Sequence, residues 1–156
     1  MTKLTTLSYG GTAAIVTGMG LVVAFDTGAT TKATLISSLL VVAIADNLAD
    51  SLAIHVYQES ENLDSKTAFR STVANYVARL VVAGSFAILA LVLPARMLVP
   101  VVLAWGMALL CAITYLVARA RGVAPGPEVL KHLAVAIVVI VVSKGIGTWI
   151  LARLSP

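Results

Sequence analysis

The chain has 156 residues, of which 60% are hydrophobic and only 12% are charged, and its formal net charge is +4. A soluble domain carries about 25% charged residues, so this composition excludes an ordinary soluble protein and indicates an integral membrane protein. Nearly all of the length is needed to cross the membrane, which leaves no room for a separate soluble catalytic domain. The basic residues mostly flank apolar segments and form no stripe of the kind that binds nucleic acid.

Five apolar stretches are long enough to form transmembrane helices, each of which needs about 20 mostly apolar residues. We expect spans over residues 7–25, 33–57, 72–93, 98–118 and 132–152. Helix breakers lie at residues 26–28, at Pro94 and at residues 122–127. Strands are not expected, because the apolar blocks are continuous rather than alternating. The prediction is an all-α polytopic fold, a compact five-helix bundle that makes residues 1–156 a single membrane domain.

The first predicted span carries a small residue at every fourth position of its first half, at Gly10, Ala14 and Gly18. Small residues at this spacing allow two helices to approach closely in lipid, where the hydrophobic effect does not drive helix association. Two interpretations stay open. This face packs inside one subunit, or it joins two copies in a homodimer.

The second predicted span contains two carboxylates four residues apart, those of Asp46 and Asp50. A charge near the bilayer centre costs about 2.5–3.5 kcal/mol on insertion scales, so such residues are rare and often functional. Because residues three and four apart share a helical face, Asn47 and Ser51 extend the patch. Its oxygen atoms suit a hard divalent cation such as Mg²⁺, Mn²⁺ or Fe²⁺. Two close carboxylates would also share a proton at neutral pH, as a proton-coupled carrier requires.

The end of the second span is also polar, with His55, Glu59 and Glu61. His55 and Glu59 are four residues apart and could form a ligand pair. However, His55 lies about half a turn away from the face that carries Asp46, which favours a solvated interfacial histidine. The acidic run that follows is either a mouth that attracts cations or simply a solvated helix end.

Two bases fall within later spans, Arg79 in the third and Lys144 in the fifth. Arg79 continues a polar stripe with four-residue spacing that includes Ser71 and Asn75. The membrane would thus hold two acids and two bases, and a paired network among them would be stable without any ligand. Two interpretations remain: a structural charge network, or a site that binds or relays an ion.

The basic residues that flank the spans predict the orientation. With five spans the termini lie on opposite faces. Six basic residues fall on the N-terminal side and three on the other, namely Lys3, Lys66, Arg70, Arg119, Arg121 and Lys131 against Lys32, Arg96 and Arg153. The positive-inside rule then predicts a cytoplasmic N-terminus and an outside C-terminus.

The order of these elements resembles the vacuolar iron transporter family. The stretches that carry the resemblance are Tyr9-Gly10-Gly11, Thr31-Lys32-Ala33 and Gly145-Ile146-Gly147. The chain would be a short, divergent member, with no long cytoplasmic metal-binding helices and with Asp46 and Asp50 where the family has a Met and a Glu. The resemblance implies a proton-coupled exporter of Fe²⁺ and Mn²⁺ that works as a homodimer, with the metal path between the subunits.

Two hypotheses about function follow. The first is a small carrier of divalent metal ions, with Asp46, Asp50 and Asn47 as ligands and with Fe²⁺ or Mn²⁺ as cargo rather than as a resident cofactor. The second is a non-transporting scaffold or accessory subunit, whose Asp–Arg/Lys network fixes the helix packing. The expected partners are membrane lipids and a second copy. An enzyme is not expected, because the chain has no Ser/His, HExxH or two-aspartate protease motif.

Overall fold

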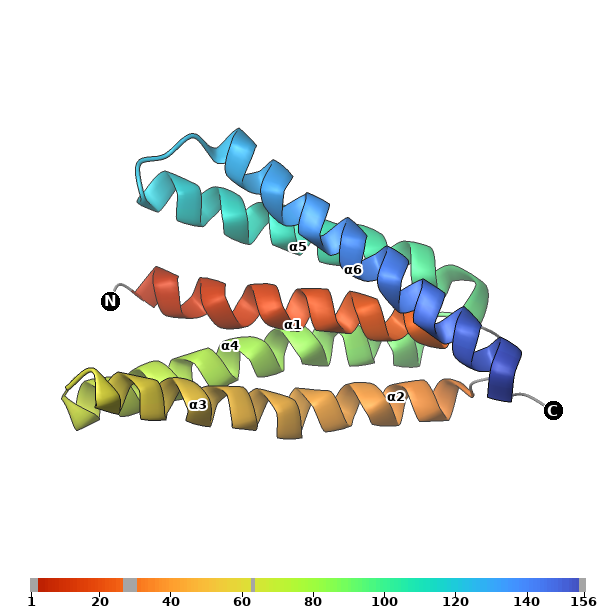
Figure 1. Cartoon of the computed structure of the whole chain (residues 1–156), viewed down its shortest axis with the longest axis horizontal. Helices are drawn as coiled ribbons and strands as arrows, with labels where there is room; N and C mark the ends of the chain where they lie inside the picture. The colour runs from red at the N-terminus through yellow and green to blue at the C-terminus, as the bar shows by residue number, and fades with distance from the viewer. Residues whose placement is uncertain (1–2, 27–30, 63, 155–156) are drawn as a thin grey trace.

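The structure, a computed structural model, describes residues 3–26, 31–62 and 64–154. These residues form helices and no strand, in the order α1 (Lys3–Phe25), α2 (Lys32–Val41), η1 (Val42–Asp46), α3 (Asn47–Ser60), α4 (Ser65–Val92), α5 (Ala95–Ala120) and α6 (Pro125–Leu154). The π-helical turn η1 joins α2 to α3 without a break, so the segment Lys32–Ser60 is one rod of 29 residues. The described chain is therefore a bundle of five rods (Figure 1).

The rods have the length and surface of membrane-spanning helices. Four of them are long and apolar enough to cross a membrane, and α1 has 23 residues with an apolar section over Gly10–Phe25. Large hydrophobic side chains lie exposed on the outer faces, among them Leu48, Val81 and Val141. An apolar exterior is what a lipid environment requires, and it confirms the all-α membrane bundle predicted from the sequence.

Helices α4 and α6 begin seven residues before the predicted third and fifth spans, at Ser65 against residue 72 and at Pro125 against residue 132. Hydropathy detects only the apolar part of a helix, whereas local hydrogen bonding sets its start. Asp64 caps α4, because its Oδ2 accepts a hydrogen bond of 3.2 Å from the backbone N–H of Thr67. Pro125 suits the first turn of α6, since it has no N–H to leave unsatisfied. The predicted break at residues 122–127 therefore ends at residue 124, and the break at residues 26–28 lies mostly outside the described residues.

Helix α1 lies at the centre of the bundle and packs against α4, α5 and α6 (Figure 1). Glycines allow each of these close approaches. A Cβ at Gly18 would lie 2.7 Å from the ring of Phe86 on α4, and one at Gly106 on α5 would collide with Met19. On α6, Gly147 lies against the backbone carbonyl of Ala24.

The small-residue face of α1 is consequently used inside the subunit. Gly10, Ala14 and Gly18 are all buried, and Ala14 is 3% exposed. This face packs against other helices of the same chain, which is the first of the two interpretations. A homodimer remains a prediction, and in this arrangement it would need a different surface.

The helix connections alternate between the two ends of the bundle. The start of α1, the α3–α4 turn and the α5–α6 turn lie at one end, and the α4–α5 turn and the end of α6 lie at the other (Figure 1). At this second end Lys32 Nζ donates hydrogen bonds to the carbonyls of Leu91 and Leu93, at 2.8 and 2.9 Å. These contacts satisfy carbonyl groups at the end of α4, which have no partner within their own helix. Which end faces the cytoplasm stays a prediction.

Candidate ion site between α3 and α4

The charged residues of the spans lie near the middle of their helices. Asp46 is fourteen residues from each end of the Lys32–Ser60 rod, and Arg79 is fourteen residues from Ser65 and thirteen from Val92. At 1.5 Å per residue, both positions lie roughly 20 Å from the helix ends. If the helices cross the membrane along their length, these charges lie close to its centre.

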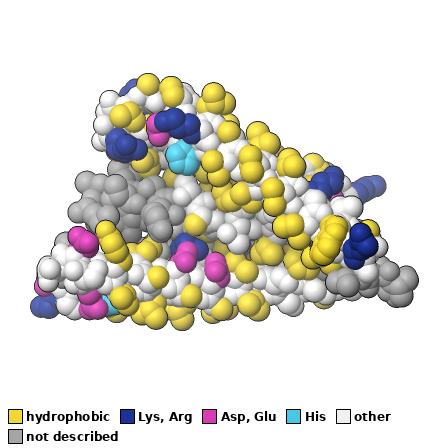
Figure 2. All heavy atoms as spheres, viewed as in Figure 1, with side chains coloured by type: hydrophobic (Ala, Val, Ile, Leu, Met, Phe, Trp, Pro, Cys, Tyr) yellow, Lys and Arg dark blue, Asp and Glu magenta, His cyan; other side chains and the backbone are white. Residues whose placement is uncertain are grey.

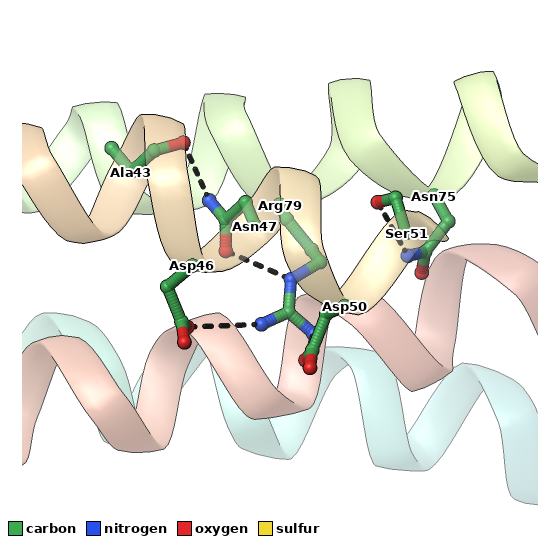
Figure 3. Close-up of polar contacts among 7 residues, drawn as sticks. All are labelled: Ala43, Asp46, Asn47, Asp50, Ser51, Asn75 and Arg79. Atoms are coloured by element: carbon green, nitrogen blue, oxygen red, sulfur yellow. Dashed lines mark hydrogen bonds and ion pairs between the residues drawn. The ribbon is translucent and has the colours of Figure 1, made fainter. Parts of the chain in front are cut away.

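Arg79 connects the two acids. Its side chain is buried, at 1% exposure, and its guanidinium reaches both carboxylates (Figure 3). Nη2 lies 3.5 Å from Oδ2 of Asp46, and Nη1 lies 2.5 Å from Oδ2 of Asp50. Nε donates a third contact, a hydrogen bond of 2.8 Å to Oδ1 of Asn47. The planar fork of donors on arginine allows one side chain to hold three acceptors in this way.

The π-helical turn positions Asp46 and Asn47. Asp46 is its last residue, and the backbone N–H of Asn47 bonds to the carbonyl of Val42, five residues back. The side chain of Asn47 donates from Nδ2 to the carbonyl of Ala43 at 2.9 Å, which directs its Oδ1 toward Arg79 (Figure 3). Single π turns within α-helices are frequent at functional sites. Nothing in the sequence predicted this turn.

The polar stripe predicted on the third span proves to be the contact between α3 and α4. Asn75 Nδ2 donates to Ser51 Oγ at 3.2 Å, and Gln58 Nε2 donates to Ser71 Oγ at 3.0 Å. Together with Arg79 these pairs give an interface held by hydrogen bonds between polar side chains, as is common between helices in membranes. The contact of Gln58 with the third span was not predicted, although Gln58 lies seven residues after Ser51 and so on nearly the same helical face.

The cluster is neither fully buried nor balanced in charge. The side chains of Asp46 and Asp50 are 52% and 49% exposed, and two carboxylates face one guanidinium. In the space-filling view, acidic side chains lie beside a basic one near the middle of the visible face (Figure 2). Because an uncompensated charge at membrane depth is costly, the remaining negative charge requires a proton, a cation or a covering partner.

The other predicted site residues lie apart from this cluster. Lys144 is exposed on α6 and pairs with none of the acids that the structure describes, so the network contains Arg79 but not Lys144. His55 and Glu59 do form a pair, with Nε2 3.4 Å from Oε1, near the end of α3. Glu61 is exposed beside them.

The metal-ligand set of a single subunit is small. Within residues 3–26, 31–62 and 64–154, no group of three or more His, Cys, Asp or Glu side chains is close enough together to hold a metal ion. Oδ1 of Asn47, which the sequence suggested as a ligand, accepts its hydrogen bond from Arg79. Comparison with known proteins finds no matching family, no similar curated protein and no similar solved structure.

Proposed function

We propose that the protein is a small membrane carrier of a cation, with Asp46 and Asp50 as its ion site and Arg79 as a fixed internal counter-ion. The supporting observation is the surplus carboxylate: two half-exposed acids share one buried base. A network that served helix packing alone would be expected to be buried and balanced, because each unpaired charge destabilises the folded state. A bound cation or proton would neutralise this surplus negative charge.

The two kinds of charge in the cluster have different roles in this proposal. Arginine carries a fixed positive charge in proteins, and the guanidinium of Arg79 is held in place by Asn47. The carboxylates can exchange partners, since about half of each side chain is open to the surroundings. Two carboxylates and one guanidinium leave each subunit with one surplus negative charge. One divalent cation shared by two subunits would balance this charge and leave Arg79 in place as counter-ion. One proton in each subunit would balance it equally, so the cation and the proton would compete.

The identity of the cargo rests on ligand chemistry and on the family resemblance. Carboxylate oxygens are hard ligands that suit Mn²⁺ or Fe²⁺ more than a soft cation, and the vacuolar iron transporter resemblance suggests the same two ions. Such ions take about six ligands, whereas one subunit offers two carboxylates here. A second copy placed against the exposed side of α3 would double the carboxylates and cover them. We therefore include a homodimer in the proposal.

The alternative function is a non-transporting scaffold or accessory subunit. The observation that favours it is that Arg79 contacts both acids and so balances part of their charge within the chain. In this account the cluster fixes the register of α3 against α4, and the cations in the surroundings have no effect on it.

A flux measurement separates the two functions. The purified protein is reconstituted into liposomes that contain a Mn²⁺-sensitive dye, and the initial rate of Mn²⁺ entry is compared among variants. The carrier proposal expects entry above that of empty liposomes, and loss of this entry in Asp50→Asn. The matched control is Asp26→Asn, which neutralises an exposed acid at the end of α1 and should transport normally. No flux in the unmodified protein with either Mn²⁺ or Fe²⁺, under an imposed pH gradient in either direction, would favour the scaffold.

A further inference from the structure

A second feature lies at the α3–α4 turn, near the end of the bundle and away from the acid cluster. It is a pocket of about 400 Å³ lined by His55, Ser65, Lys66, Phe69 and Arg70. Lys66 and Arg70 are four residues apart on α4, so their charged ends lie on the same face of the helix. The ring of His55 packs edge-on against Phe69, with 6.4 Å between the ring centres, and this contact forms one wall.

No acidic residue of the described chain lines this pocket. Neither Lys66 nor Arg70 forms an ion pair with an acid in the described part of the chain. The two nearby carboxylates of Glu59 and Asp64 contact His55 and Thr67, and neither lines the pocket. The pocket therefore presents positive charge and a serine hydroxyl to an incoming group.

A shallow apolar groove continues from the pocket along α4. It has a volume of about 650 Å³, shares Phe69 and Arg70 with the pocket, and runs on past residues of one helix face, namely Val73, Ala74, Val77, Ala78 and Val81. The three valines are 43%, 49% and 67% exposed, so no other described helix covers this face. The small alanines between them leave the space that forms the groove.

The dimensions of the groove match one leaflet of a membrane. From Phe69 to Val81 is twelve residues, or about 18 Å along a helix, whereas half of the hydrocarbon core measures about 15 Å. The groove begins one turn into α4 and ends beside Arg79, at the middle of the helix. Positive charge thus lies at the depth of lipid head groups, and apolar surface follows at the depth of acyl chains.

We propose that the pocket and groove together bind one anionic phospholipid. Its phosphate lies between Lys66 and Arg70, within reach of the Ser65 hydroxyl, and one acyl chain follows the valine face to the middle of α4. Each basic residue close to the membrane surface strengthens the attraction of an anionic lipid by about fivefold. The site is independent of the proposed ion site, because it shares none of the three charged residues of that cluster.

Native mass spectrometry of the full chain, released from micelles that contain phosphatidylglycerol or phosphatidylcholine, tests this proposal. The unmodified protein should retain phosphatidylglycerol and lose phosphatidylcholine. The double variant Lys66→Gln/Arg70→Gln should weaken retention of phosphatidylglycerol by about 25-fold, the product of two basic residues. The matched control, Arg119→Gln/Arg121→Gln, removes two bases at the same end of the bundle that do not line the pocket, and it should retain the lipid.

A second pair of variants tests the acyl groove without changing any charge. Ala74→Phe fills the groove and should weaken phosphatidylglycerol retention, whereas Ala112→Phe, at an exposed position on α5, should leave it unchanged. Both changes lie on the surface, so the fold is expected to tolerate them.

Four results would overturn the proposal. One is equal retention of the two lipids by the unmodified protein, and another is equal loss of phosphatidylglycerol in the basic double variant and its control. The third is displacement of the lipid by glycerol phosphate at equal concentration, which would mean that the acyl chain contributes nothing. The last is loss of a protein dimer, rather than of lipid, in Ala74→Phe, which would assign the groove to a second copy.

Discussion

The side chain of Arg79 packs directly against Gly10, where a Cβ atom would lie 2.7 Å from Cγ of the arginine. Oδ1 of Asn75 lies closer still to the same position. Helix α1 therefore has no side chain at the place where the polar residues of α4 cross it. The position of the guanidinium, and with it the geometry of Asp46 and Asp50, depends on this glycine.

Replacing Gly10 by Ala is expected to lower the melting temperature of the protein in detergent. The added methyl group must displace Asn75 and Arg79, and overpacking of this kind costs about 1–3 kcal/mol. Gly84→Ala is the matched control, since a Cβ at Gly84, in the middle of α4, has no other atom within 4 Å. That change should stabilise the helix by up to about 1 kcal/mol, because alanine favours helix more than glycine does. Equal shifts for the two variants would mean that the contact beneath Gly10 is unimportant.

Neutralising one acid should be far less damaging than neutralising both. In Asp50→Asn the buried guanidinium keeps Asp46 as its partner, so we expect a small change in melting temperature. In Asp46→Asn/Asp50→Asn the buried charge of Arg79 has no ionic partner, and loss of such a partner costs about 3–5 kcal/mol. Adding Arg79→Met to this double variant removes the unpaired charge and should recover most of the loss. If Asp50→Asn alone destabilises as much as the double variant, Arg79 does not use the two acids interchangeably.

The membrane orientation can be tested by cysteine labelling. In a Cys111→Ala background, single cysteines at Glu61 and Arg121 should react with an impermeant maleimide only after the cells are opened. A cysteine at Arg96 should react in intact cells, because it lies at the opposite end of the bundle and the positive-inside rule places that end outside. Labelling of Glu61→Cys in intact cells would reverse the orientation.

The sequence predicted those parts of the structure that depend on long or regular patterns. Five continuous apolar blocks were enough to predict five spans. Four-residue spacing identified both the acid patch and the polar stripe on the third span. Helices α4 and α6 extend beyond the predicted spans at their N-terminal ends, since the capping side chain of Asp64 and the missing N–H of Pro125 lie outside the apolar windows.

The pairing within the site could not be predicted in the same way. Arg79 and Lys144 both lie within spans, and only the packing of α4 and α6 in the bundle leaves Arg79 in contact with the acids and Lys144 exposed on the surface. The π turn before Asn47 has no signature in composition. The close contact at Gly10 depends on how α1 crosses α4. The residue pattern of a single helix does not predict that crossing.

The proposal that the cluster is a cation site is tested most directly by the thermal stability of Arg79→Gln with and without Mn²⁺. Without the internal counter-ion, both carboxylates lack a positive partner, so the variant should melt below the unmodified protein. Mn²⁺ should then raise its melting temperature by more than it raises that of the unmodified protein. This rise should be absent in the triple variant Arg79→Gln/Asp46→Asn/Asp50→Asn, which has no charge to balance. If Arg79→Gln melts early and ignores Mn²⁺ and Fe²⁺, while the triple variant regains the original stability, the cluster is a structural network and the cation site is contradicted.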